Sequence, residues 1–348
     1  MNTTHLSNKA QSIPPRRRDV GEFLGQLLAP LGQLIINLLD AFMLPLQRIV
    51  GVKGMAYIFI LPNMLVFSVF VLLPMATNFV YTFTGSDKLF LDERPYVGLA
   101  NLERLFDCED FLNPNSCDED LFLRAVYNTG WFVFAQVTLM ILVSLLTAVI
   151  LNRNIPARGF FRSVFFYPVL LSPIVVALIW KWILQESGLF NGLLVGFGAE
   201  KVRFLTSATW ARFWVVMIST WAYMGFYTLI LLAGLQSIPS ELYEAAEMDG
   251  AGNLRKFWAV TLPLLMPTML VVVVLSSIRA VQIFDIVFAF TGGGPGSATT
   301  FIVQYIYNNG FASPFREFGL AAATSLVMAT VLVIFTLAQL WLNRGDSL

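Results

Sequence analysis

The chain has 348 residues, of which 57% are apolar and only 13% are charged, and its 22 basic residues balance 22 acidic residues. Soluble domains contain about 25% charged residues, so this composition excludes an ordinary water-exposed fold, and the zero net charge gives no indication of a nucleic-acid partner. The only histidine is His5, which excludes catalytic triads and metal sites that depend on histidine. The sequence also lacks a Gly-x-x-x-x-Gly-Lys-Ser/Thr loop, so any use of ATP requires a separate subunit.

The N-terminal region, residues 1–54, is expected to form a cytoplasmic tail followed by one or two amphipathic helices on the membrane surface. Apolar residues recur there at helical spacing; they are Leu24, Leu28, Leu31, Ile35, Leu38, Phe42 and Ile49. Pro30 and Pro45 are expected to interrupt or kink this stretch. A seventh membrane span is the alternative, but it would place the basic loop around Arg158 outside the cell, against the preference of basic loops for the cytoplasm.

Six further stretches are apolar enough and long enough to cross a bilayer, which takes about 20 residues. They cover approximately residues 55–79, 126–151, 160–184, 213–235, 264–290 and 318–342. The fifth stretch is unusual because it contains two charged residues, Arg279 and Asp285. We therefore predict an all-α polytopic membrane protein with six core transmembrane helices within residues 55–348 and an N-terminal interfacial amphipathic helix.

The loop between the first two spans, residues 84–125, is expected to lie outside the cytoplasm. It contains ten acidic residues and both cysteines of the chain, Cys108 and Cys117. An oxidising compartment favours a disulfide between these two cysteines, and two free thiols are the alternative. The acidic residues lack the regular spacing of a calcium-binding loop, so we predict a solvated surface and no metal site.

A second loop, residues 236–263, joins the fourth and fifth spans and is expected to face the cytoplasm. Ser240, ahead of an acidic first turn, is typical of a capping residue at a helix start. Gly250 is expected to turn the chain, and Asn253 is expected to cap a second short helix. The loop is therefore predicted to form a helix-turn-helix that projects from the membrane and is suited to docking into another protein.

The spacing of residues in this loop is specific. Glu244-Ala245-Ala246, Gly250 and then Val260-Thr261-Leu262-Pro263 resemble the EAA loop in permease subunits of bacterial ATP-binding-cassette importers, with Val260 where isoleucine is usual. Phe284-Asp285, followed by Thr291-Gly292-Gly293-Gly294-Pro295, resembles the end of the fifth core span in the carbohydrate, or maltose-type, class of these permeases. The resemblance covers approximately residue 55 to the C-terminus.

This resemblance implies both the fold and the partners of the chain. The helix that contains Glu244 would be a coupling helix on a cytoplasmic ATPase dimer, which binds the ATP and Mg²⁺; this chain itself would bind no cofactor. The residues implied in coupling are Glu244, Ala245, Ala246, Asp249, Gly250, Leu262 and Pro263. A second, homologous permease would complete the pathway, and a periplasmic solute-binding protein would deliver the substrate. The chain would lie in the bacterial inner membrane with both termini in the cytoplasm.

Charged groups inside a membrane normally face a cavity or a partner. In similar permeases, the third to fifth spans line a small polar substrate site, and on this basis we predict that Ser219, Tyr223, Ser276 and Arg279 bind the substrate. An arginine there can donate hydrogen bonds to sugar hydroxyls or to an acidic sugar. The alternatives are that Arg279 pairs structurally with Asp285 or with a backbone carbonyl, or that it faces the partner permease.

The function predicted from these features is that of a membrane-spanning permease subunit, not an enzyme, which forms half of an ATP-driven import pathway for a carbohydrate or sugar derivative. An ion-coupled secondary transporter is one alternative, but such carriers show broken helices in matching halves and buried acidic or histidine relays. A membrane scaffold without transport activity is the other alternative, and it would not require a docking loop of this pattern.

Overall fold

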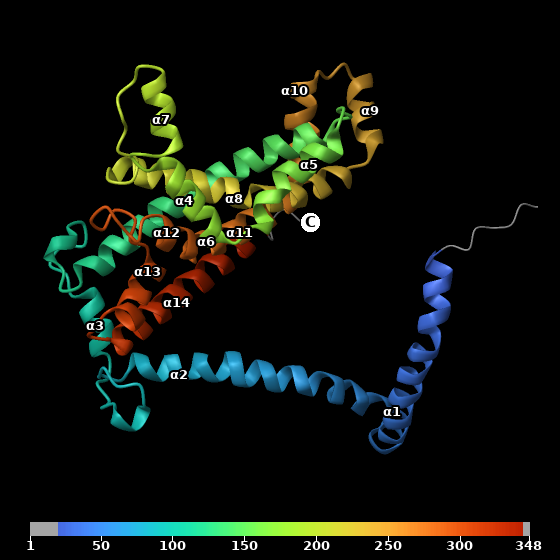
Figure 1. Cartoon of the computed structure of the whole chain (residues 1–348), viewed down its shortest axis with the longest axis horizontal. Helices are drawn as coiled ribbons and strands as arrows, with labels where there is room; N and C mark the ends of the chain where they lie inside the picture. The colour runs from blue at the N-terminus through green and yellow to red at the C-terminus, as the bar shows by residue number, and fades with distance from the viewer. Residues whose placement is uncertain (1–19, 344–348) are drawn as a thin grey trace, which may run out of the picture. The chain divides into compact units, whose positions relative to one another are not determined.

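The computed structural model describes residues 20–343, in which helices joined by loops form the fold (Figure 1). In chain order the α-helices are α1 (Val20–Phe67), α2 (Leu73–Thr82), α3 (Ala100–Phe106), α4 (Asp120–Asn152), α5 (Arg158–Phe166), α6 (Pro173–Leu184), α7 (Leu189–Gly196), α8 (Ala208–Gln236), α9 (Ser240–Met248), α10 (Asn253–Lys256), α11 (Leu262–Val281), α12 (Asp285–Phe290), α13 (Ile302–Tyr307) and α14 (Phe318–Asn343). Short 3₁₀ or π-helical turns connect some of them; they are η1 (Ser68–Leu72), η2 (Leu91–Glu93), η3 (Pro114–Ser116), η4 (Tyr167–Leu170), η5 (Phe257–Thr261) and η6 (Asn308–Ala312). The expected cytoplasmic tail, residues 1–19, and the last residues, 344–348, lie outside the described residues.

Six helical stretches among the described residues are long and apolar enough to cross a membrane. They are Met43–Thr82, Asp120–Asn152, Pro173–Gly196, Ala208–Gln236, Asn253–Val281 and Phe318–Trp341. This confirms the predicted all-α fold with six membrane-spanning helices.

The chain divides into two compact units between Met75 and Ala76. In the first unit, α1 is a long helix that continues through Pro30 and Pro45, so neither proline interrupts it, while a kink at either one stays a prediction. The φ angle that proline imposes is compatible with a helix, so a helix can continue through a proline, although it loses one backbone hydrogen bond and the ring crowds the preceding turn. Helical geometry fails instead at Gly51, where φ is 75° and ψ is 169°. The placement of residues before this point on the membrane surface stays a prediction.

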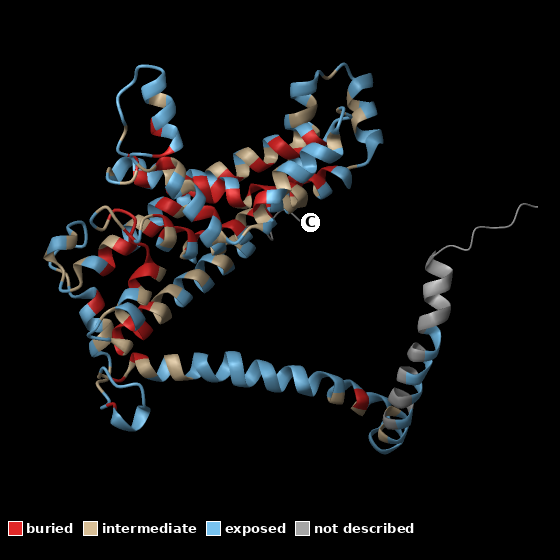
Figure 2. Cartoon of the chain, in the orientation of Figure 1, coloured by how far each residue is buried: buried red, intermediate tan, exposed pale blue. Residues whose placement is uncertain are grey.

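The core of the second unit is built around α8. In the most apolar 18-residue stretch of α8, 67% of the residues are buried, whereas the corresponding share is 22–28% in the other membrane-spanning stretches of this unit. Apolar side chains of α4, α8 and α11 form one cluster that includes Met140, Leu231 and Leu265. A second cluster joins α6 and α12 to α8 through residues such as Val176, Ile218 and Ile286. Figure 2 shows the buried residues concentrated along these helices.

The predicted third span, residues 160–184, is not one continuous helix. α5 ends at Phe166, η4 follows, and α6 starts only at Pro173. Pro168 and Pro173 have no backbone N–H to donate to a helical hydrogen bond, and the residue before a proline avoids helical geometry. These two effects explain why the helix breaks between α5 and α6. The end of α5 lies against the middle of α8, where a Cβ atom on Gly225 would be 2.4 Å from the carbonyl oxygen of Phe165. Glycine therefore allows the backbones of α5 and α8 to approach each other.

Replacing Gly225 with alanine is expected to destabilise the protein by about 1–3 kcal/mol, because the methyl group overlaps backbone atoms and the two helices must move apart. Thermal unfolding of the purified variant in detergent measures this effect. Gly130→Ala is the matched control, since Gly130 lies within α4 and has no atom within 4 Å of the added methyl group. Equal melting temperatures for the two variants would contradict the close contact at Gly225.

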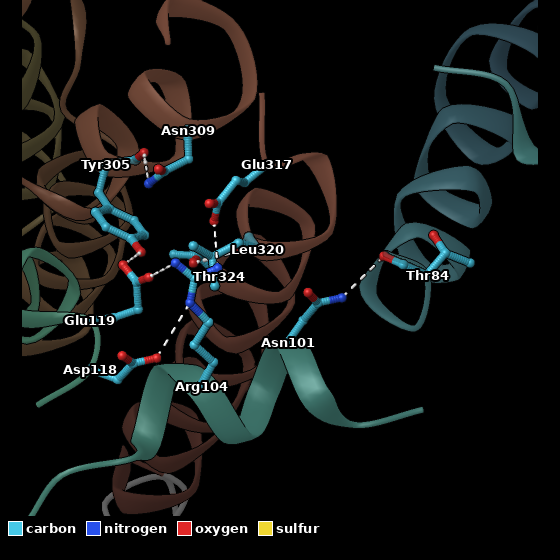
Figure 3. Close-up of polar contacts among 10 residues, drawn as sticks. All are labelled: Thr84, Asn101, Arg104, Asp118, Glu119, Tyr305, Asn309, Glu317, Leu320 and Thr324. Carbon is cyan, nitrogen blue, oxygen red and sulfur yellow. Dashed lines mark hydrogen bonds and ion pairs between the residues drawn. The ribbon is translucent and has the colours of Figure 1, made fainter. Parts of the chain in front are cut away.

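One end of this unit, here called the disulfide end, carries the loop in which Cys108 and Cys117 form a disulfide. Figure 3 shows the polar contacts that hold it together. Arg104 on α3 forms ion pairs with Asp118 at 3.5 Å, with Glu317 at 2.8 Å and with Glu119. Together these pairs connect α3 to the chain segments just before α4 and α14.

Tyr305 on α13 joins the same network by donating a hydrogen bond of 2.7 Å to Glu119. Burial raises the pKa of the Tyr305 hydroxyl, and the hydrogen bond to Glu119 raises it further, so the hydroxyl stays protonated as a donor. Two regions that are distant in sequence, residues 104–119 and 305–317, therefore meet at the disulfide end.

Replacing Arg104 with alanine is expected to leave three carboxylates close together without a cation, and to lower stability by about 1 kcal/mol, since the arginine is partly exposed. Thermal unfolding at low and high salt measures the effect, which salt reduces by screening. Arg316→Ala is the control, because Arg316 is an exposed neighbour of Glu317 that forms no ion pair among residues 20–343. An equal change in both variants would contradict a specific role for Arg104.

Candidate functional site

A cavity of about 400 Å³ opens between α4, α8, α11 and the start of α12. All four residues predicted to bind substrate, Ser219, Tyr223, Ser276 and Arg279, line it. The first two come from the middle of α8, and the other two lie one turn apart near the end of α11. The antiparallel order of these spans brings residues about 60 positions apart in sequence to one wall.

Arg279 is the largest polar group on this wall. Its guanidinium carbon lies 4.4 Å from the centre of the Tyr223 ring, which is within the range of a cation–π contact. The side chain is exposed, as is Asp285, which also lines the cavity. Among residues 20–343, no ion pair within 4 Å joins Arg279 to an acidic residue. The cavity therefore holds one cation and one anion that remain accessible to a ligand.

The two serines differ in how their hydroxyl groups are satisfied. The Ser276 hydroxyl donates a hydrogen bond of 3.1 Å to the carbonyl oxygen of Val273, one turn earlier in α11. The Ser219 hydroxyl is buried and has no hydrogen-bond partner within the described part of the chain. A buried hydroxyl without a partner costs free energy, so Ser219 is suited to accept or donate a bond to a bound molecule or to water.

The structure adds cavity residues that the sequence analysis did not identify. Gln136 of α4 is almost fully buried and accepts a hydrogen bond of 3.4 Å from the Thr220 hydroxyl. Tyr227 and Phe284 contribute aromatic rings. Gln136 could have been identified from the sequence, because it is a polar residue within the apolar second span. Polar side chains inside a membrane usually face the interior of the protein.

The predicted fifth span is interrupted beside this cavity. α11 ends at Val281 and α12 begins at Asp285, with Phe284 between them in a non-helical conformation (φ −142°, ψ −61°). The prediction of one continuous helix over residues 264–290 is therefore wrong. The break places the Asp285 carboxylate in the first turn of α12, where a helix favours negative charge.

At the end of the bundle opposite the disulfide end, α9 and α10 form the predicted projecting helix-turn-helix (Figure 1). Glu244, Ala245, Asp249 and Gly250 are exposed, and Ala246 is half-buried. The arrangement gives an open helix face with acidic groups beside small side chains. Such a face can approach another protein closely.

Two backbone hydrogen bonds of 2.9 Å close the turn after α9. The N–H of Gly250 donates to the carbonyl oxygen of Glu247, and the N–H of Ala251 donates to the carbonyl oxygen of Ala246. The φ angle of Gly250 is 75°, which favours glycine. Two predicted caps are wrong, because Ser240 and Asn253 are already the first helical residues and neither Pro239 nor Gly252 before them makes a side-chain cap.

α10, the second helix of the helix-turn-helix, does not end before the fifth membrane span begins. α10, η5 and α11 form one uninterrupted helical run from Asn253 to Val281, so Leu262 and Pro263 lie within it. The Tyr243 hydroxyl of α9 lies 3.1 Å from the Thr261 hydroxyl of η5, which ties α9 to this run. This contact joins α9 to the same helical run that carries Ser276 and Arg279.

Among the described residues, no group of three or more His, Cys, Asp or Glu side chains has a geometry that holds a metal ion. The acidic loop at the disulfide end uses several of its carboxylates in ion pairs with Arg104 and Arg124 instead.

Comparison with known proteins identifies the family of this fold. The sequence profile described as "Binding-protein-dependent transport system inner membrane component" matches residues 120–345. The chain is 35% identical over 291 residues to the trehalose/maltose transport system permease protein MalF of Thermococcus litoralis, covering 83% of this chain and 94% of that protein. It is 32% identical over 295 residues to the arabinooligosaccharides transport system permease protein AraP of Bacillus subtilis, covering 84% of this chain and 89% of that protein.

A solved structure supports the same fold. It contains a bacterial alginate ABC transporter in complex with an alginate pentasaccharide-bound periplasmic protein. One of its chains superposes on this protein with a TM-score of 0.68 at 24% identity, covering 84% of this chain and 95% of that chain. At this level of identity the match concerns the fold alone.

Proposed function

Since the chain belongs to the family of inner-membrane components of binding-protein-dependent transport systems, we propose that it forms one half of an ATP-driven import pathway for a carbohydrate. The cavity between α4, α8, α11 and α12 carries this proposal, because it combines hydroxyl, amide and charged groups with aromatic rings. Such a mixture suits a small polyhydroxylated molecule. Relatives that are named for transport of trehalose, maltose and arabinooligosaccharides support the same substrate class.

In this proposal the energy comes from a separate ATPase dimer, which binds ATP and Mg²⁺, while this chain holds no cofactor. The α9 face with the exposed Glu244 and Ala245 and the half-buried Ala246 docks into the ATPase surface, and Glu244 pairs with a basic group there. Gly250 sets the turn that presents this face. Closure of the ATPases then displaces α9, and the continuous run from α10 to α11 transmits the movement to the cavity.

The proposed orientation places the disulfide end outside the cytoplasm. The Cys108–Cys117 disulfide supports this assignment, because disulfides persist in oxidising compartments. The basic residues Arg153, Arg158 and Arg162 lie on the opposite side, as expected for a cytoplasmic loop. A periplasmic solute-binding protein then docks on the disulfide end, and both termini lie in the cytoplasm.

A second permease subunit is proposed to close the other side of the pathway. The cavity is open on one side, and Arg279 and Asp285 on its wall are exposed in the isolated chain. Intramembrane charges that remain exposed to lipid are costly, so a protein partner that covers this side is expected.

Affinity purification of the tagged full-length chain from detergent-solubilised membranes, followed by mass spectrometry, tests these partners. We expect recovery of a second permease, a Walker-motif ATPase and, with sugar present, a solute-binding protein. Recovery of the chain alone under several mild detergents would contradict the proposed assembly and favour a self-sufficient carrier.

A further inference from the structure

A second cavity lies at the base of the projecting helix-turn-helix and is here called the basal cavity. Its volume is about 410 Å³. The last turns of α4 and α8 bound it on one side, and α9, α10 and η5 bound it on the other. It shares no lining residue with the cavity around Arg279. The basal cavity is therefore separate from the candidate substrate site.

The polar side chains that line the basal cavity are cationic or neutral. They are Asn152, Arg153, Tyr243, Asn253, Lys256 and Thr261. Within the described part of the chain, no carboxylate lines this cavity. Each of the six side chains can donate a hydrogen bond. A set of donors that carries two positive charges suits a phosphate group, whose oxygens accept charge-assisted hydrogen bonds.

The two cations of the basal cavity differ in how they are neutralised. Lys256 forms an ion pair with Glu247 of α9. Arg153 is exposed and forms no ion pair within 4 Å with any acidic residue among residues 20–343. The other carboxylates of the helix-turn-helix are exposed and do not line the cavity; they are Glu241, Glu244 and Asp249. One positive charge at the cavity is thus left for a ligand.

The remaining lining of the basal cavity is apolar and places it at the membrane boundary. Val149, Leu235 and Phe257 provide this apolar part. Val149 and Leu235 lie at the ends of the spans Asp120–Asn152 and Ala208–Gln236. At the end of a span the hydrocarbon core of the bilayer gives way to lipid headgroups. The cavity therefore combines apolar and cationic groups at the depth of the headgroups.

The start of α5 marks the same depth. It carries Arg158 and Arg162 beside the exposed rings of Phe160 and Phe161. In the part of the chain that the structure describes, neither arginine has an acidic partner within 4 Å. Arginines next to aromatic rings at the end of a span are typical of the membrane–water boundary. Only residues 153–157 separate α5 from α4, so this boundary lies next to Arg153.

We propose that the basal cavity binds the phosphate headgroup of an anionic phospholipid. The phosphate accepts hydrogen bonds from Arg153 and from the neighbouring amide and hydroxyl donors, while the acyl chains contact the apolar lining. A soluble phosphate compound gains nothing from that apolar lining. A zwitterionic headgroup brings a further cation to a cavity that already has two. The inference uses the insertion of this chain in a membrane and does not depend on the proposed substrate.

A lipid headgroup in this place connects two parts of the chain that are far apart in sequence. It contacts Asn152 and Arg153 at the end of α4, and Asn253 and Lys256 on α10. This position is next to the contact between Tyr243 and Thr261 that joins α9 to the run into α11. The bound lipid therefore stabilises the helix-turn-helix against the end of α4.

The test uses the full-length chain, purified in detergent with the subunits that accompany it and washed free of loosely held lipid. Native mass spectrometry measures the binding of palmitoyl-oleoyl-phosphatidylglycerol (POPG), which is anionic, and of the corresponding phosphatidylcholine (POPC), which is zwitterionic. We expect POPG to bind roughly tenfold more tightly than POPC. Arg153→Gln is expected to raise the Kd for POPG about fivefold, and Arg153→Gln/Lys256→Gln is expected to raise it further.

Arg255→Gln is the matched control for the loss of one positive charge. Arg255 is exposed and lies next to Lys256 on α10, but it does not line the basal cavity. Its replacement is expected to change the Kd for POPG less than about twofold. Added POPG is also expected to raise the melting temperature of the wild-type chain, because a ligand that binds the folded state stabilises it. Arg153→Gln is expected to reduce this increase, and Arg255→Gln is expected to preserve it.

A soluble probe separates the lipid from a free phosphate compound as the ligand. Sn-glycerol 3-phosphate carries the phosphate of POPG without acyl chains, and it is expected not to displace bound POPG. If it does displace POPG, the cavity binds a soluble phosphate compound and the lipid assignment is wrong. Equal Kd values for POPG and POPC would overturn the inference. An equal loss of POPG affinity in Arg153→Gln and Arg255→Gln would overturn it as well, because only the general charge of this surface would then matter.

Discussion

Replacing Glu244 with lysine is expected to abolish ATP-driven uptake and to release the ATPase from the purified complex. Glu244 is an exposed carboxylate on α9, which is part of the projecting helix-turn-helix. Reversing the charge of one member of a buried interfacial ion pair weakens binding by about 2–5 kcal/mol, which is roughly a 30-fold to few-thousandfold loss of affinity. Quantitative mass spectrometry of the purified complex and its ATPase activity measure the change.

Glu241→Lys is the matched control for this variant. Glu241 is an exposed glutamate on the same helix, one turn earlier, and the charge change is identical. The melting temperature of the isolated permease shows whether either substitution affects folding. If Glu241→Lys releases the ATPase as strongly as Glu244→Lys, the specific pairing assigned to Glu244 is wrong, and only the overall charge of α9 matters.

Replacing Arg279 with alanine is expected to raise the KM for uptake roughly 10- to 150-fold while the complex still assembles. Hydrogen bonds to a charged group contribute about 1.5–3 kcal/mol each, and Arg279 is the only cation that lines the cavity among residues 20–343. Arg279→Lys keeps the charge but loses the planar group that lies over Tyr223, so an intermediate KM is expected. Uptake kinetics in proteoliposomes, with ATPase activity recorded in parallel, provide the measurement.

A double variant distinguishes substrate binding from a structural role of Arg279. If Arg279 only neutralises Asp285, removing both charges in Arg279→Ala/Asp285→Ala restores uptake, because no unpaired charge remains in the membrane. If Arg279 binds substrate, the double variant stays impaired. Lys181→Ala serves as the control for loss of an exposed cation, since Lys181 does not line the cavity.

The sequence was sufficient to predict the spanning helices and the projecting loop, because both depend on local patterns. Uninterrupted apolar runs between charges mark membrane spans, and the turn at Gly250 follows from residue type. The four proposed substrate residues also lie in one cavity, since antiparallel neighbouring spans bring mid-span polar groups to the same depth.

What the sequence did not reveal depends on contacts between distant segments. The break between α5 and α6 faces Gly225, and neither feature is visible in hydropathy. The interruption at Phe284 lies in an apolar run that was counted as one span. The ion-pair network of Arg104 joins residues more than 200 positions apart, and no local pattern predicts such pairs. The helical run through Leu262 and Pro263 also differs from the separate short helix expected there, because the π-helical turn η5 directly before them continues the helix from α10 into α11.

The most direct test of the central claim is sugar uptake by proteoliposomes that contain the purified complex, with ATP supplied on the side of α9 and the binding protein on the side of the disulfide. Uptake is expected only when ATP, the binding protein and both permeases are present, and it is expected to stop with Glu244→Lys. Accumulation driven by a sodium or proton gradient without ATP, and unaffected by that variant, would contradict the assignment of this chain to an ATP-driven importer.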